Sequence, residues 1–478
     1  MAIGDGPCDT GTVIRRRAPF ACALLGGALV ACQGAGPAAS DAGGDAQLEG
    51  RAEAGAEDAA TWRDGDPGSV SALALEVQAY LSDENPGAEP PLLQKLAGPY
   101  RDLSFQALER AVRTRVDSPR RLRAGIREER WTNPFTGKEN RYHAVVTRRV
   151  AASPGPVPLV LFLHGAGGNG ESVARAESLQ AVADRLGALL VAPTSDGTCD
   201  WNSFEECMSQ VVLLVPLLKR RYPIDDDRVV LTGFSMGGRG SLSVAATYPE
   251  PYCGVVPFAG AIGAVHPSTN VEDHRIYCCP HAENLLGLRV HHTVGDQDMQ
   301  LMVLQNRACD SCLKAQRSES IYDELAGQGH VFPVERWRVA VSWALERARQ
   351  PYPRRVVYQR AKHLSAYVAG GLFFQTKLLA PQYWAVMEAP RDPTKPSRLE
   401  AEVKGGEIHL TASNVARVGL YLADELVALD APVRVLLGGK VLHEGKVARD
   451  RALLLTEAHR RAERSMLFAA RLALDLPP

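Results

Sequence analysis

The sequence has no excess of charge of either sign, since its 478 residues include 54 Lys and Arg against 55 Asp and Glu. Because no basic field is available to attract phosphates, we expect no nucleic-acid partner. The uncharged run from Ala18 to Ala31 is too short for a membrane-spanning helix, which needs about 20 residues. No internal repeat is visible. The composition is that of a globular protein, with 45% hydrophobic residues, and at roughly 100–200 residues per domain it predicts two or three domains.

The N-terminus carries the pattern of a secretion signal. Arg15 to Arg17 form a cationic segment ahead of the apolar run, an order typical of signal peptides. The run ends in Leu29-Val30-Ala31-Cys32, which resembles the lipobox of bacterial lipoproteins. This resemblance implies that residues 1–31 are a signal peptide and that Cys32 is lipidated. We therefore expect a protein held at a membrane surface of the bacterial cell envelope, facing the periplasm or the exterior. An ordinary cleaved signal with an incidental cysteine and a twin-arginine signal are the alternatives.

The ten cysteines fit an oxidising compartment. If Cys8 and Cys22 leave with the signal peptide and Cys32 is acylated, seven cysteines remain in the mature chain. They are Cys199, Cys207, Cys253, Cys278, Cys279, Cys309 and Cys312. An odd number leaves at least one thiol free or bonded to another molecule. The spacing Cys309-x-x-Cys312 also occurs in metal and redox sites, but no second such pair accompanies it, so we expect disulfides.

Composition divides the rest of the chain into four segments. Residues 32–68 are rich in Ala, Gly, Asp and Glu and cannot bury enough apolar surface to offset their ordering entropy, so we expect a disordered tether. Residues 69–140 carry a helical pattern. Residues 141–350 alternate short apolar runs with helical segments. Residues 351–478 contain two Gly-Gly pairs between apolar runs, which predict hairpins in a small β-rich accessory domain with a C-terminal tail that begins as a helix.

The segment 141–350 predicts an α/β fold. Its apolar runs lack polar alternation, which is typical of strands covered on both faces. These runs are Pro158 to Leu163, Ala188 to Pro193, Arg228 to Phe234, Gly254 to Ala261 and Leu288 to Val294. Helical segments at about 171–186, 205–221, 236–247 and 333–349 complete a βαβ series, so we expect a mostly parallel sheet with helices on both faces. Pro216 lies inside one of these helices and should kink or divide it.

The strongest functional signal is Gly233-Phe234-Ser235-Met236-Gly237, where a predicted strand gives way to a helix. A serine on a sharp strand-to-helix turn is lifted above the sheet edge, and small flanking residues let that turn close. The helix N-terminus also favours negative charge at this point. We therefore interpret Ser235 as a nucleophile. The alternative is a glycine-rich loop with a passive serine.

A serine hydroxyl is a weak nucleophile at neutral pH and needs a base, which in turn needs an orienting acid. His330 follows Gly327-Gln328-Gly329 and is our candidate base, although it also fits a solvated loop histidine. Asp298 follows the strand at 288–294 and is our candidate acid, with Asp296 second, since either aspartate also fits a turn.

The negative oxygen of a tetrahedral intermediate needs two backbone N–H donors aimed at it. One donor should belong to Met236, directly after the serine. The other should come from the glycine-rich stretch Leu163 to Gly168, from Gly165 or Ala166. His164 in this stretch fits a second candidate base or a buried side chain that holds the loop, and we favour the loop-holding role.

Residues 141–350 resemble the polyhydroxyalkanoate-depolymerase, feruloyl-esterase and phospholipase/carboxylesterase branch of the α/β-hydrolase superfamily. The matching segments are Pro158 to Gly170, Trp201, Tyr222 to Gly238, Gly295 to Asp298, and Gly329-His330. The resemblance implies that Ser235, Asp298 and His330 act together, in the family order serine, acid, histidine, and that Met236 and Gly165–Ala166 supply the oxyanion N–H groups. The C-terminal region resembles an accessory domain of some bacterial esterases.

The expected activity is carboxylic ester hydrolysis on a small-molecule or polymer ester, through an acyl-enzyme on Ser235 and without a metal or organic cofactor. A serine peptidase of the prolyl-oligopeptidase kind uses the same three side chains and is one alternative. A catalytically inactive surface binding protein with a hydrolase fold is the other, since a lipid anchor and a β-rich domain suit such a role.

Overall fold

The computed structural model describes residues 67–84, 91–98, 100–115, 122–195, 200–201, 205–262, 270–360 and 383–477. The chain divides into two compact units, Met1–Asp58 and Ala59–Pro478, and all the described residues belong to the second. The predicted signal peptide, Cys32 and nearly all of the predicted tether lie outside the described residues. Within the described ranges, no helix is long and apolar enough to cross a bilayer.

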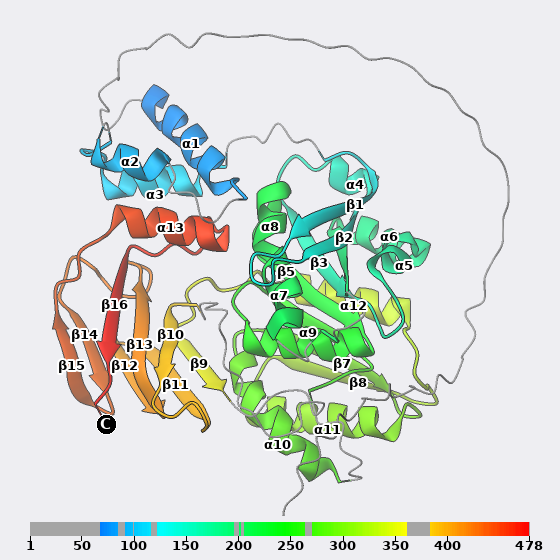
Figure 1. Ribbon diagram of the computed structural model, residues 1–478. Helices are drawn as coiled ribbons and strands as arrows, with labels where there is room; N and C mark the ends of the chain where they lie inside the picture. Colours follow the sequence, from blue (N-terminus) through cyan, green and yellow to red (C-terminus); the bar gives the residue numbers. More distant parts are fainter. Residues whose placement is uncertain are drawn as a thin grey trace, which may run out of the picture. The chain divides into compact units, whose positions relative to one another are not determined.

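Residues 125–325 contain an eight-stranded sheet in the order β1-β2-β4-β3-β5-β6-β7-β8 (Figure 1). The strands are β1 (Gly125–Thr132), β2 (Glu139–Val146), β3 (Val157–Leu163), β4 (Leu189–Thr194), β5 (Ile224–Phe234), β6 (Gly254–Phe258), β7 (Arg289–Gly295) and β8 (Ser320–Leu325). The pairs β1–β2 and β2–β4 are antiparallel, and all the other pairs are parallel. This order and these directions confirm the predicted α/β-hydrolase fold.

Helices cover both faces of this sheet, as the apolar runs predicted. They are α4 (Arg148–Ala151), α5 (Gly170–Arg175), α6 (Glu177–Leu186), α7 (Glu205–Val212), α8 (Leu214–Arg221), α9 (Met236–Thr247), α10 (Val271–Ala282), the short 3₁₀ helix η1 (Glu283–Leu285), α11 (Gln300–Ala315) and α12 (Val334–Leu345). Side chains alternate along β3: Leu159 and Leu161 pack in the core beneath α8 and α9, and Val160 and Phe162 pack beneath α6 and α12. Each fully buried leucine stabilises the fold by about 1.5–3 kcal/mol.

Two details of the sheet differ from the sequence prediction or refine it. The sheet starts at Gly125, so the predicted boundary at residue 141 is too late. The edge strand β1 carries the charged sequence Arg-Glu-Glu-Arg at 127–130 and buries only Trp131, which hides its strand character in the sequence. Pro216 divides the predicted helix 205–221 into α7 and α8, with the break at Leu213, because proline has no N–H to continue the hydrogen-bond ladder.

The C-terminal region forms two sheets around one core. A five-stranded sheet has the order β15-β14-β12-β11-β9, and a three-stranded sheet has the order β10-β13-β16. Their strands are β9 (Arg355–Arg360), β10 (Ala385–Pro390), β11 (Ser397–Lys404), β12 (Glu407–Ser413), β13 (Val415–Leu422), β14 (Val433–Leu437), β15 (Lys440–Gly445) and β16 (Ala470–Asp475). Both predicted hairpins are present, with each Gly-Gly pair at positive φ in a two-residue turn.

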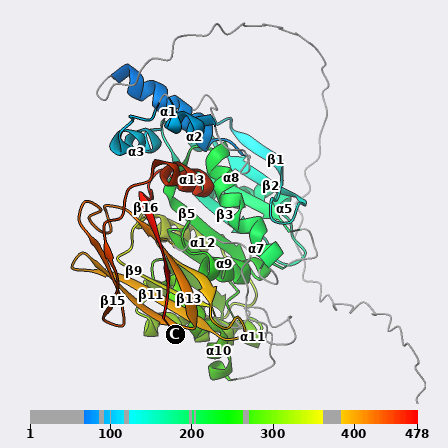
Figure 2. The ribbon, with the colours of Figure 1, turned by 60° about the vertical axis from the view of Figure 1, so that its left-hand side comes forward.

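The N-terminal helices pack on the C-terminal tail. Helices α1 (Pro67–Leu81), α2 (Pro91–Ala97) and α3 (Phe105–Arg113) share an apolar core with α13 (Arg451–Arg461). Figures 1 and 2 both show α13 between these helices and the C-terminal sheets. The predicted helical start of the tail is therefore present, and it stabilises a segment that lies more than 300 residues earlier in the chain.

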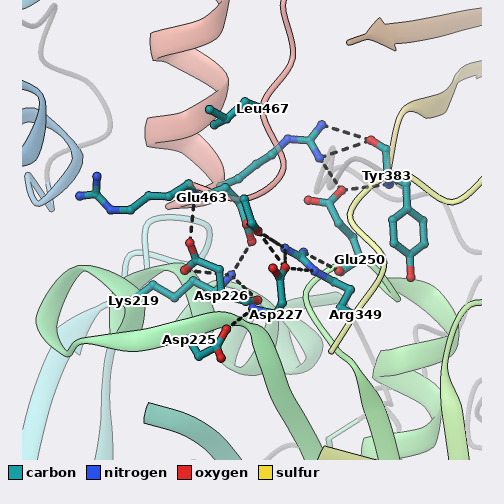
Figure 3. A network of polar contacts seen from close by, with 12 residues as sticks. Lys219, Asp225, Asp226, Asp227, Glu250, Arg349, Tyr383, Glu463 and Leu467 are labelled. Atoms are coloured by element: carbon teal, nitrogen blue, oxygen red, sulfur yellow. Dashed lines mark hydrogen bonds and ion pairs between the residues drawn. The ribbon is translucent and has the colours of Figure 1, made fainter. Parts of the chain in front are cut away.

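Buried ion pairs join the segment directly after α13 to the amino end of β5 (Figure 3). Arg349, with 1% of its side chain exposed, lies 2.8 Å from Asp227 and 2.8 Å from Glu463. Lys219, with 2% exposed, pairs with the same Glu463 and lies 3.8 Å from Asp226. Buried charges of this kind are tolerated only when each has a partner, and here every one of them has.

Candidate active site

Ser235 lies on a strained turn between β5 and α9. Its backbone angles, φ 57° and ψ −116°, fall in a region that residues other than glycine rarely adopt. A Cβ atom on Gly237 would lie 1.9 Å from the carbonyl oxygen of Leu163, and one on Gly233 would lie 2.4 Å from that of Gly237. Only glycine fits at these two positions, so the motif is required by the close approach of β3. The turn leaves Ser235 half-buried at the carboxyl end of β5.

Three side chains from distant parts of the chain meet here. The Nε2 atom of His330 lies 2.9 Å from Ser235 Oγ, and its Nδ1 atom lies 2.9 Å from both carboxylate oxygens of Asp298. The Asp298 side chain is fully buried and also accepts a hydrogen bond from the N–H of Met299, whereas 32% of the His330 side chain is exposed. The structure therefore brings Ser235, His330 and Asp298 into one row of hydrogen bonds. Ser235 and His330 are partly exposed to solvent, and Asp298 is buried.

Asp296, the second candidate acid, has a different neighbour. Its Oδ1 atom accepts a hydrogen bond from the N–H of Gly327 at 2.8 Å, and it makes no described contact with His330. A Cβ atom on Gly295 would lie 2.2 Å from the carbonyl oxygen of Gln328, so the two loops are in close contact. Asp296 thus holds the loop that carries His330, whereas Asp298 contacts the His330 ring itself.

Aromatic rings support the His330 loop from below. The Phe234 ring lies 4.8 Å from the His330 ring, and Phe332 packs against Phe234 at 5.6 Å between centroids. Phe332 also contacts Phe162 and Trp337 in the core beneath α12. The imidazole therefore rests on a packed apolar base, which limits its motion relative to Ser235.

Both ring nitrogens of His164 form hydrogen bonds with backbone atoms. Its Nδ1 atom lies 2.8 Å from the carbonyl oxygen of Gly165, and its Nε2 atom accepts a hydrogen bond from the N–H of Ser195 at 3.1 Å. Burial lowers the pKa of this histidine, which favours the neutral ring that these two bonds require. Neither nitrogen is available to Ser235, so His164 holds the loop, as we favoured.

The predicted oxyanion residues lie around the serine. Met236 is the first residue of α9, directly after Ser235. A Cβ atom on Gly165 would lie 3.5 Å from the Cβ atom of Ser235 and 3.3 Å from the carbonyl oxygen of Phe234, so the loop after β3 passes directly beside the nucleophile. Ala166 is the next residue of that loop and is exposed.

The cysteine-rich stretch forms a covalent clamp beside the acid. Cys278 and Cys279 of α10 are bonded to Cys309 and Cys312 of α11, respectively. The Cys309-x-x-Cys312 pair is thus part of the expected disulfide framework. Cys207 is also disulfide-bonded, and Cys253 is buried and free, in line with the odd number of cysteines. Sequence reasoning did not predict α10 and α11 as helices.

The central segment of the chain is similar to known esterases. Residues 155–347 match the family model described as "Putative esterase". A curated relative, "Putative esterase NocK" of Nocardia uniformis subsp. tsuyamanensis, is 30% identical over 137 residues, which cover 26% of this chain and 39% of the relative. The chain therefore matches less than half the length of this relative. The family match agrees with the resemblance inferred from the sequence motifs.

Solved structures of similar fold include several esterases. A thermostable esterase is 21% identical, with coverage of 47% of this chain and 63% of that chain and a TM-score of 0.36. A ferulic acid esterase is 15% identical, with coverage of 46% and 97% and a TM-score of 0.39. The poly(3-hydroxybutyrate) depolymerase LpqC of Bordetella parapertussis is 17% identical, with coverage of 48% and 92% and a TM-score of 0.38.

Proposed function

We propose that this chain, whose residues 155–347 match the family model described as "Putative esterase", hydrolyses carboxylic esters through an acyl-enzyme on Ser235. The observation that carries the proposal is the unbroken row of hydrogen bonds from Ser235 Oγ through His330 to Asp298. The 2.9 Å contact between Oγ and Nε2 is within the reach that proton transfer needs.

In the proposed mechanism, Ser235 Oγ attacks the ester carbonyl while His330 Nε2 takes the hydroxyl proton. Asp298 accepts a hydrogen bond from Nδ1–H, which keeps the ring in the tautomer that leaves Nε2 free and stabilises the imidazolium. His330 then returns the proton to the leaving alcohol. Water, activated by the same histidine, releases the acid and restores the serine hydroxyl.

The developing oxyanion would be stabilised by the N–H of Met236 and by that of Gly165 or Ala166. Two observations support this assignment: the backbone at Ser235 is strained, and Gly165 lies close to the Ser235 side chain. Both place backbone donors at the site before the substrate arrives. Removal of such a donor from other enzymes costs about 10²–10³-fold in kcat, so its contribution should be large.

The test is hydrolysis of 4-nitrophenyl butyrate together with labelling by a fluorophosphonate probe. We expect the wild-type protein to do both, and Ser235→Ala to lose the label and at least about 10⁴-fold in kcat. A peptide 4-nitroanilide in parallel distinguishes the peptidase alternative. Labelling of Ser235→Ala at the wild-type level, or cleavage of the anilide alone, would overturn the proposal.

We also propose that the protein is exported and attached to a membrane surface through lipidated Cys32. Cys32 lies outside the described residues, and the support comes from elsewhere: disulfides between α10 and α11 fit an oxidising compartment. Expression of the full chain in a bacterium should place it in the membrane fraction, and Cys32→Ala should release it. Equal partition of the two proteins would contradict the anchor.

A further inference from the structure

Arg239 differs from the other buried arginines of the chain. Four described arginines are largely buried, namely Arg239, Arg289, Arg349 and Arg461. Three of them pair with carboxylates: Arg289 with Glu319 at 2.9 Å, Arg349 with Asp227 at 2.8 Å, and Arg461 with Glu250 at 2.6 Å. Arg239 is 8% exposed, its Nε atom is buried without a hydrogen-bond partner, and no described carboxylate pairs with its guanidinium.

An arginine remains charged at any physiological pH, so burial does not neutralise it. A buried charge without a partner is unfavourable for folding, and a ligand of opposite charge would supply the missing partner. Arg239 therefore has the properties of a binding residue. The other three arginines of this buried group each have a carboxylate partner within the fold.

The position of Arg239 points to the reactive centre. It lies in the first turn of α9, and its N–H donates to the carbonyl oxygen of Ser235 at 3.0 Å. Helical side chains lean toward the helix N-terminus, so the Arg239 side chain runs back toward the end that carries Ser235. The loop after β6 covers this turn: a Cβ atom on Gly260 would lie 2.5 Å from the Arg239 nitrogen. The backbone of Arg239 thus lies one helical turn after the nucleophile and against the loop that follows β6, and its Nε atom is buried.

We propose that Arg239 binds a carboxylate of the substrate, so that the preferred ester carries a negative charge close to the bond that is cleaved. Arg239 follows Ser235 by one helical turn, so we expect this carboxylate to lie a short chain away from the scissile carbonyl. Half-esters of short dicarboxylic acids and esters of carboxylated phenols have this form. The inference rests on the proposed esterase function and names the substrate class for the same site.

The test compares esters that differ only in this charge. On the acyl side, 4-nitrophenyl hemisuccinate is paired with its methyl-capped form, 4-nitrophenyl methyl succinate. On the alcohol side, 4-acetoxybenzoate is paired with methyl 4-acetoxybenzoate. We expect kcat/KM to favour the charged member of one pair, and the pair that responds shows which side of the ester faces Arg239.

The substitution Arg239→Gln should lower this preference by about 10- to 100-fold, mainly through KM, because a charge-assisted contact is lost. Arg239→Lys should restore part of the preference. Arg228→Gln is the matched control: Arg228 lies in β5, seven residues before the serine, its side chain is 41% exposed and it pairs with Asp225, so the preference should not change. An equal loss of kcat/KM for both members of each pair in Arg239→Gln would overturn the inference.

A binding measurement separates this inference from the proposed function. The Ser235→Ala variant lacks the nucleophile, so its binding can be measured without turnover. It should bind monomethyl glutarate more tightly than dimethyl glutarate in a calorimetric titration. The double variant Ser235→Ala/Arg239→Gln should lose that difference. If no ester is hydrolysed but the binding difference is present and depends on Arg239, the esterase proposal fails and the carboxylate site stands. If the two glutarates bind Ser235→Ala equally, the carboxylate site fails even when neutral esters are hydrolysed.

Discussion

The two ends of strand β5 hold their charged groups in opposite ways. At the amino end, Asp226 and Asp227 lie among Lys219, Arg349 and Glu463, and every one of these buried charges has a partner (Figure 3). At the carboxyl end, Ser235 has a strained backbone, and the guanidinium of Arg239 has no described carboxylate partner. The amino end therefore stabilises the fold and joins the segment directly after α13 to the sheet, whereas the carboxyl end keeps strain and charge available for a ligand.

The largest expected effect sharpens the comparison at the carboxyl end. Asp298→Asn should lower kcat/KM for a 4-nitrophenyl ester by about 10³–10⁴-fold, because the amide no longer holds the His330 tautomer that accepts the serine proton. Asp296→Asn is the matched control and should cost far less activity, since Asp296 bonds only the Gly327 N–H among the described residues. Steady-state kinetics decide between them, and a larger loss in Asp296→Asn would exchange the two assignments.

The second prediction compares the two arginines directly. Arg349→Met should reduce the free energy of unfolding by about 3–5 kcal/mol, because it leaves the buried Glu463 and the half-buried Asp227 without this partner. Arg239→Met should leave the free energy of unfolding unchanged or raise it, because no described carboxylate loses a partner when this arginine is replaced. Urea unfolding of the two variants measures both values. Equal destabilisation by the two substitutions would contradict the distinction between the ends.

The third prediction concerns the two disulfides between α10 and α11. The two disulfides link the same two helices and close loops of 31 and 33 residues. Because the two loops are nearly the same, either bond alone should retain most of the entropic stabilisation. Replacement of one pair by serines should cost less than about 1 kcal/mol, and replacement of both should cost about 3–4 kcal/mol. Thermal unfolding of the three variants tests this, and additive losses would contradict it.

The smallest effect is a pH dependence at the amino end. Burial raises the pKa of Glu463, but Arg349 and Lys219 outweigh burial and lower that pKa to about 2. A lowered carboxylate pKa stabilises the fold above the unfolded value of about 4.3 and loses this effect as the pH falls toward 2. The destabilisation caused by Glu463→Gln should therefore shrink between pH 4.5 and pH 2.5. Burial raises the pKa of the neighbouring Asp226, which acts in the opposite direction, so the difference between variant and wild type is the quantity to measure.

Local patterns predicted much of the sheet and of the serine turn. The continuous apolar runs predicted five of the eight strands of the sheet, because side chains that alternate between two buried faces leave no polar gap. The edge strands β1 and β8 and the strand β2 beside β1 were not predicted, since partly exposed strands carry charged residues that resemble a helix or a loop. The Gly-Gly hairpins were predicted because a two-residue turn needs positive φ at adjacent positions.

The sequence alone determined which residues can take a strained backbone and where charge can lie, because glycine spacing and apolar period act over a few residues. Only the tertiary structure decided which charges find partners. Arg349 reaches Glu463 across 114 residues, and no local feature distinguishes it from Arg239. The same holds for Asp296 and Asp298, which share one turn but face different neighbours. Pairing depends on segments that meet only when the chain folds, and the bonding of Cys278 with Cys309 was equally beyond sequence reasoning.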